Sequence, residues 1–342
     1  MIHTDNYVPC CSHPSTVVVV NSSDMRHVQS LLPKPKWLYR FYMNPIKALE
    51  FLEKQQQPTS LGSHWQRDQH NSNCFNSNSF DHGVRSLLQR AFDTRRHLQV
   101  SALVTSQSLF HISGAQLCER VALPHVQTLL LGPNNMCAEG ISLMSQGKIH
   151  SFLDDSALGQ HLEKTLATAQ KRFFQSLSAP LYDLLFFFDP HHPLFDPAVA
   201  QTLENAVQKT GAAEFYLCGP QGDFIFITAK GEFTGFVVRS QRQIDALLNS
   251  QEAKRASVRV VESLQKGTHI LCLPPKGHGG PIPVAQWQDH LYEAQTFQGK
   301  QTYRFACVPN WVALNDSFTP LAYCNKPSLP VPIDSDASPH LF

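Results

Sequence analysis

Clusters of histidine and carboxylate are the parts of this chain whose residue types could bind a metal ion. His191 and His192 lie between Asp189 and Asp196, and imidazole with carboxylate is a common ligand set for Zn²⁺. Adjacent histidines point apart on an extended chain, however, and the three prolines of residues 189–197 favour a turn. We therefore expect a loop there and no metal site.

Two further clusters suggest chemistry by composition alone. Cys10, Cys11 and His13 are crowded together, but a zinc site needs a fourth ligand from elsewhere, so we expect a flexible leader. The glycine-rich run 277–280 resembles a phosphate-binding loop, yet two prolines follow it closely and no helix N-terminus is available to hold an anion. The sequence predicts no metal and no cofactor.

The bulk composition narrows the class of protein. The chain has 342 residues, enough for two domains, with 28 Lys and Arg against 27 Asp and Glu. A balanced charge gives no electrostatic attraction to nucleic acid or to an anionic membrane. The nine cysteines contain no C-x-x-C pair, and no secretory signal is recognised, so we expect free thiols in the cytoplasm. The longest apolar run, residues 184–188, is far shorter than the ~20 residues of a membrane span.

Buried strands alternating with helices are the main structural signal of the first half. Residues 16–20 are all β-branched, the pattern of a parallel strand buried on both faces. The five expected strands are 16–20, 37–42, 100–104, 128–131 and 149–153. Helices expected between them indicate βαβ units and a doubly wound parallel sheet of order 2-1-3-4-5. This is an α/β fold of the flavodoxin-like type.

The remaining sequence divides into a domain plan. A flexible leader (1–15) precedes the first domain (16–156), which carries a polar insertion (53–82) and then a helix (84–92). A helical linker (157–188), interrupted at Pro180, leads to a mixed α+β domain (189–324) and a flexible tail (325–342). The second domain is expected to contain a helix at 198–208 and a hairpin formed by 224–228 and 233–239.

The order of these elements, together with several short strings, resembles a bacterial response-regulator family of two-component signalling. In that family a receiver domain with an insertion precedes a C-terminal domain of its own type, and the quorum-sensing response regulators of Legionella are similar. The resemblance covers residues 16–310. Its strings are NPIKALEFL (44–52), DH (81–82), ISG (112–114) with LC (117–118), LLLG (129–132), GKIHSFL (147–153), FYL (215–217), GDFIF (222–226) and WQDHL (287–291).

The resemblance also implies which residues occupy the positions of receiver chemistry. A working receiver needs an acidic pair for Mg²⁺, an acceptor aspartate, a Thr or Ser and a Lys. Here the acidic pair falls on Asn21 and Ser22, and the acceptor falls on Ser106, counted back from Gly114. The last two positions fall on Leu131 and on residues 154–155, where Asp155 or its neighbour Asp154 replaces the lysine. A serine hydroxyl is a weak nucleophile without a base, so the resemblance implies a pseudo-receiver that lacks phosphorelay chemistry.

An apolar stripe along the expected linker helix has two interpretations. Leu162, Leu166 and Phe173 recur at helical spacing, which indicates either packing inside the domain or a dimer contact, because an apolar helix face does not reveal its partner. We expect a homodimer with these three residues at its interface.

Three functions remain as hypotheses. The first is a phosphorylation-independent signalling protein, not an enzyme, that acts by binding a protein partner such as a sensor kinase or regulator. The second is a regulatory protein whose C-terminal domain binds a nucleotide or small ligand. The third is a transcriptional regulator, which the lack of a basic helix-turn-helix pattern in 190–342 disfavours.

Overall fold

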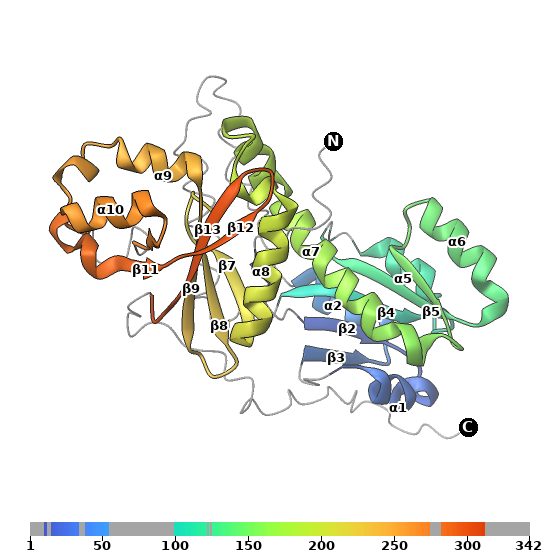
Figure 1. Cartoon of the computed structure of the whole chain (residues 1–342). Coiled ribbons are helices and arrows are strands. Elements are labelled where there is room, and N and C mark those ends of the chain that lie inside the picture. The colour runs from blue at the N-terminus through green and yellow to red at the C-terminus, as the bar shows by residue number, and fades with distance from the viewer. Residues whose placement is uncertain are drawn as a thin grey trace, which may run out of the picture. The chain divides into compact units, whose positions relative to one another are not determined.

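The computed structural model describes residues 10–11, 15–33, 38–54, 99–121, 123, 125–273 and 282–311. The chain forms two compact units, with the boundary between residues 177 and 178. The described part of one unit lies within 15–177, and that of the other comprises 10–11 and 178–311. Both are drawn in Figure 1.

The first unit is built on a five-stranded parallel sheet of order β3-β2-β4-β5-β6. Its strands are β2 (Ser15–Val19), β3 (Tyr39–Tyr42), β4 (Val100–Ser106), β5 (Gln127–Gly132) and β6 (Ser151–Asp154). Numbered along the chain, this order is 2-1-3-4-5, so the predicted fold class is confirmed.

Helices cover both faces of this sheet because its strands are apolar on both faces. Val17 and Val19 belong to a core cluster shared with α2 (Pro45–Lys54), α5 (Gly114–Arg120) and α6 (Cys137–Ser145). Val18 and Val20 belong to a second cluster, shared with α1 (Ser22–Leu31) and α7 (Leu158–Phe188). Successive strand residues point to opposite faces, which explains why one run of valines enters two cores.

The second unit is built on a six-stranded antiparallel sheet of order β1-β7-β8-β9-β13-β12. Its strands are β1 (Cys10–Cys11), β7 (Ala212–Leu217), β8 (Phe224–Thr228), β9 (Phe233–Ser240), β12 (Gln295–Gln298) and β13 (Thr302–Pro309). The helix α8 (Pro197–Thr210) packs on β7, β8 and β9. The predicted hairpin of β8 and β9 is confirmed.

A smaller cluster completes this unit. The helices α9 (Gln241–Leu248) and α10 (Val258–Lys266) and the 3₁₀ segment η6 (Val284–His290) surround an apolar core that contains Trp287. A two-stranded sheet of β10 (His269–Leu271) and β11 (Leu291–Glu293) lies beside them.

Three details of the structure differ from the sequence expectations. Cys10–Cys11, expected in a flexible leader, pairs with β7 as an edge strand, and Ser15 already begins β2. The helix α7 continues through Pro180, which we expected to interrupt it. Two short strands, β11 and β12, had no prediction.

Other expectations lie outside the described residues. These are most of the leader, the polar insertion beyond Lys54, the helix at 84–92, the glycine-rich run 277–280 and the tail from 325. Within the residues that are described, no helix is long and apolar enough to cross a membrane.

Candidate functional site

The carboxyl edge of the parallel sheet brings several of the predicted site residues together. Ser106 is the last residue of β4, and its partner in the register of β5 is Leu131. Leu131 is buried at 2% exposure, whereas Ser106 is half-buried at the end of its strand. The predicted acceptor and switch positions are therefore neighbours.

The loop after β4 is closed tightly against this edge. The Gln107 amide donates to the Leu131 carbonyl at 2.7 Å, and the Gln107 carbonyl accepts from the Gly114 amide at 2.9 Å. A Cβ on Gly114 would lie 2.2 Å from the Ser106 carbonyl oxygen. Only glycine allows α5 to begin so close to the end of β4.

Asn21 lies at the same edge, after β2, and bonds the loop that follows β4. It follows β2 and precedes α1, and its side-chain Nδ2 donates to the Ser108 carbonyl at 2.5 Å. A carboxylate at position 21 has no hydrogen to donate, so this bond is specific to the amide. Ser22, the first residue of α1, is exposed.

Carboxylates occupy the end of β6, where a receiver has its lysine. Asp154 Oδ1 accepts from the amides of Ser156 and Ala157 at 3.0 and 3.1 Å, and also from the Ser156 hydroxyl. The Ser156 hydroxyl, with the backbone amides, lowers the pKa of Asp154. Asp154 thus serves to cap the turn that leads into α7.

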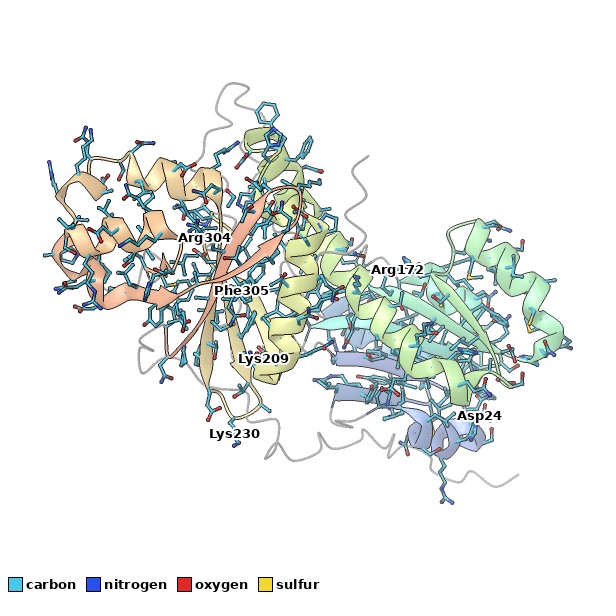
Figure 2. All side chains as sticks on the ribbon, in the orientation of Figure 1. Asp24, Arg172, Lys209, Lys230, Arg304 and Phe305 are labelled. Carbon is cyan, nitrogen blue, oxygen red and sulfur yellow. The ribbon has the colours of Figure 1, made fainter. Side chains whose placement is uncertain are left out.

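Asp155 is the more exposed of the two carboxylates. Its amide donates to the Gly132 carbonyl at 3.0 Å, which holds it beside the end of β5. Burial, followed by the nearby carboxylates of Asp24 and Asp154, raises the pKa of Asp155. Asp24 lies on α1 and is labelled in Figure 2. The charge at this edge is therefore negative where a phosphoryl group would need a cation.

The chemistry available at this edge is limited. The predicted acceptor position holds a hydroxyl, and the two predicted metal-binding positions hold an amide and a hydroxyl, none of which is a strong ligand for Mg²⁺. Among the residues that the structure describes, no group of three or more His, Cys, Asp or Glu side chains is placed to hold a metal ion.

The predicted dimer residues are not on the surface. Leu162 and Leu166 are 1% and 5% exposed, in the core cluster with α1 and the parallel sheet. Phe173 is fully buried, with its ring 5.2 Å from that of Phe174. Leu162 and Leu166 are therefore core residues of the first unit and not an available interface, which corrects the prediction for these two residues. The homodimer itself stays a prediction.

The second unit contains a charged pair that the sequence analysis missed. Asp223 and Arg239 form a two-pronged ion pair, with Arg239 Nη2 2.9 Å from Asp223 Oδ2, and their side chains are 9% and 12% exposed. Phe224 pairs with Phe236, so Asp223 and Arg239 are diagonal neighbours on one face of the hairpin. The hairpin register was the signal that could have predicted this pair.

His192, by contrast, has a structural role. Its Nδ1 accepts from the Leu194 amide at 3.3 Å, so the proton resides on Nε2, which donates to the Pro220 carbonyl at 2.9 Å. Burial lowers the pKa of His192 to about 4, so the ring is neutral at pH 7.

Comparison with known proteins includes an extensive structural match. No family model and no curated protein matches the sequence. The structure of the Legionella pneumophila response regulator LqsR is similar, with a TM-score of 0.72, 19% identity, and coverage of 92% of this chain and 94% of that chain. A receiver domain of an HD domain-containing protein from Pseudomonas fluorescens Pf-5 matches with a TM-score of 0.33 and 14% identity over 48% of this chain and 93% of that chain. A receiver domain of a putative Luxo repressor protein from Vibrio parahaemolyticus matches with a TM-score of 0.31 and 12% identity over 50% and 97%.

The match to LqsR shows a shared fold. It extends over both units, and it confirms, for the fold, the resemblance to response regulators predicted from the sequence.

Proposed function

We propose that this chain is a signalling protein of the response-regulator type that works without aspartyl phosphorylation and acts by binding another protein. The observation that carries the proposal is the position of Ser106. It ends β4 beside Leu131, at the place where receiver chemistry requires an acceptor carboxylate.

Each step of phosphoryl transfer is weakened at this edge. An acceptor must attack phosphorus, and the Ser106 hydroxyl has no base assigned to it by any hydrogen bond among the described residues. Phosphoryl transfer also needs a metal ion to offset charge on the transferring group. Asn21 instead uses its amide to hold Ser108. Asp155 contributes a negative charge that opposes an incoming phosphate.

The way in which such a protein would signal follows from the lack of a phosphorylation switch. A ligand shifts a conformational equilibrium only through its different affinities for the two states. Without a phosphoryl group, and with Leu131 in place of a switch hydroxyl, we propose one dominant conformation and a permanently presented surface. In this proposal the chain has no catalytic role and its partner is a cytoplasmic protein.

Exposure to a phosphodonor tests the chemical part of the proposal. The full chain is incubated with acetyl phosphate and Mg²⁺, and its intact mass is measured before and after treatment with hydroxylamine, which cleaves acyl phosphates. We expect no added phosphate. Stoichiometric, hydroxylamine-sensitive phosphate on any residue of the first unit would refute the proposal.

A variant of the same chain provides the matched control. Asn21→Asp, Ser22→Asp and Ser106→Asp together restore the acidic pair and the acceptor. We expect this triple variant to gain phosphate under the same conditions, because the groups that hold Mg²⁺ and attack phosphorus are then present. Ser106→Asp alone should remain unmodified.

A further inference from the structure

A pocket of about 480 Å³ lies within the second unit. This volume is in the range of small-molecule sites. Its walls come from the end of α7, the loop before β8, and β9, α9, α10 and β10; α9, α10 and β9 are labelled in Figure 1. Most of the lining is apolar, from Leu185, Ile244, Leu247, Leu264, Ile270 and Leu271.

Hydrogen bonds within the chain hold the walls in place. The Ser240 and Gln243 side chains form a capping box that begins α9. The Ser257 hydroxyl caps α10 at the Val260 amide. Arg304 Nη1 donates to the Leu264 carbonyl at 3.1 Å, and Figure 2 labels Arg304. The pocket is therefore largely formed before a ligand enters, which reduces the ordering cost of binding.

The polar residues of the lining, which we call the polar end, include Asp189, His192, Gln221, Arg239 and Gln243. Besides the two contacts with Asp223, Arg239 Nη1 donates to the Val238 carbonyl at 2.7 Å. Burial alone would lower the pKa of Arg239, but Asp223 raises it, so the group stays charged. A guanidinium has five N–H donors. The three bonds to Asp223 and Val238 use three of them, and two have no partner among the described residues.

The polar end has no net charge, and this favours a neutral ligand over a charged one. Arg239 is balanced by Asp223, and Asp189, which lines the pocket, is balanced by Arg242 at 3.0 Å. His192 is neutral, as described above. An anion entering this pocket would lose its hydration without meeting an unbalanced cation, and a cation would meet no unbalanced carboxylate.

We infer that this pocket binds a neutral, mainly apolar small molecule whose carbonyl or hydroxyl oxygen accepts hydrogen bonds from the Arg239 guanidinium. The apolar body of the ligand lies against the leucines and isoleucines of the wall, and the Gln243 side chain, which also lines the pocket, offers a second polar contact. This inference does not depend on the phosphorylation-independent role proposed above.

Three probes that share an eight-carbon chain and differ in the head group test the inference: octanamide, octanoate and octylammonium. Each is titrated into the full chain by calorimetry, with the melting temperature as a second measurement, because a ligand of the folded state raises it. We expect octanamide to bind at least about tenfold more tightly than either charged probe, since the charged head groups lose hydration without compensation.

Two exposed positions provide a blocking variant and its control. Ala246 is exposed and lines the pocket, so Ala246→Trp should obstruct it and weaken octanamide binding at least about tenfold, by overpacking. Val258 on α10 is 72% exposed and does not line the pocket, so Val258→Trp should bind octanamide like the unmodified chain.

A third variant tests the charge argument. Gln221 is exposed and lines the polar end, and only its backbone carbonyl accepts a bond, from Gln243 Nε2 at 3.3 Å. Gln221→Lys therefore adds an unbalanced cation without removing that bond, and should move the preference towards octanoate. For the unmodified chain, equal affinities for the three probes or no octanamide binding at millimolar concentration would overturn the inference. It would also be overturned if Ala246→Trp bound octanamide as tightly as the unmodified chain, or if Gln221→Lys kept the same preference among the three probes.

Discussion

Substitution of Leu166 tests whether α7 forms part of a core or part of an interface. It lies on α7 and is 5% exposed, within the cluster that contains residues of α1 and the parallel sheet. Leu166→Ala removes three carbon atoms from that cluster. At about 0.8 kcal/mol for each buried carbon group, the transfer term is about 2.4 kcal/mol. The cavity left behind raises the expected loss of unfolding free energy to about 3 kcal/mol.

The assay for this prediction is urea unfolding of the full chain followed by circular dichroism, with light scattering at micromolar concentration to measure the oligomeric state. We expect Leu166→Ala to lower the unfolding midpoint of the transition that includes α7 and to leave the oligomeric state unchanged. Lys164→Ala, at an exposed position of the same helix, is the control and should change the unfolding free energy by less than about 0.5 kcal/mol. The reasoning is refuted if Leu166→Ala dissociates a dimer while the unfolding free energy stays at the control value.

Two further predictions concern a buried histidine and a glycine. The pKa of His192 is lowered from its usual value near 6.5 to about 4 in the folded chain. Between pH 6.5 and 4 the unfolded state therefore binds more protons than the folded state, and the unfolding free energy decreases as the pH falls through this range. The loss approaches about 3 kcal/mol; denaturant midpoints from pH 7 to 4 should show it, and His192→Gln should lack it. Gly114→Ala should destabilise by about 1–3 kcal/mol, because its Cβ would lie 2.2 Å from the Ser106 carbonyl oxygen, whereas Gly159→Ala, with its nearest neighbour at 3.9 Å, should be neutral or stabilising. Equal effects of the two glycine changes in urea unfolding would contradict the packing argument.

The parallel sheet was predictable because its signal is local. A run of four valines in residues 17–20 predicts a strand buried on both faces, and the right-handed crossover of βαβ units limits the possible strand orders. The two core clusters contain alternate valines of this run, as that pattern requires.

The errors have tertiary causes. Cys10–Cys11 is too short to show any periodicity, and its strand exists only because β7 offers an edge. Pro180 costs a helix interior roughly 3 kcal/mol, but the buried side chains of Leu177, Leu181 and Leu185 continue the apolar stripe on both sides of it. Each such leucine contributes about 1.5–3 kcal/mol on burial, enough to offset the proline.

The candidate site was only partly predictable. The positions of Ser106 and Leu131 follow from strand order, but the bond from Asn21 to Ser108 connects residues 87 positions apart. The Asp223–Arg239 pair depends on the register of a hairpin, and the pocket beside it depends on α9 and α10. None of these arrangements has a signal in the spacing of single residues.

Addition of Mg²⁺ and beryllofluoride to the full chain is a direct test of independence from aspartyl phosphorylation, because together these reagents mimic an acyl phosphate at a working receiver edge. Methyl NMR spectra would be recorded for leucine and valine side chains, which include Leu131 beside Ser106 and the valines of β2. We predict that the spectra stay unchanged with Mg²⁺ alone and with both reagents. Saturable shifts of Leu131 and its neighbours, dependent on both reagents, would show that the phosphorylation pocket is functional and would contradict the account.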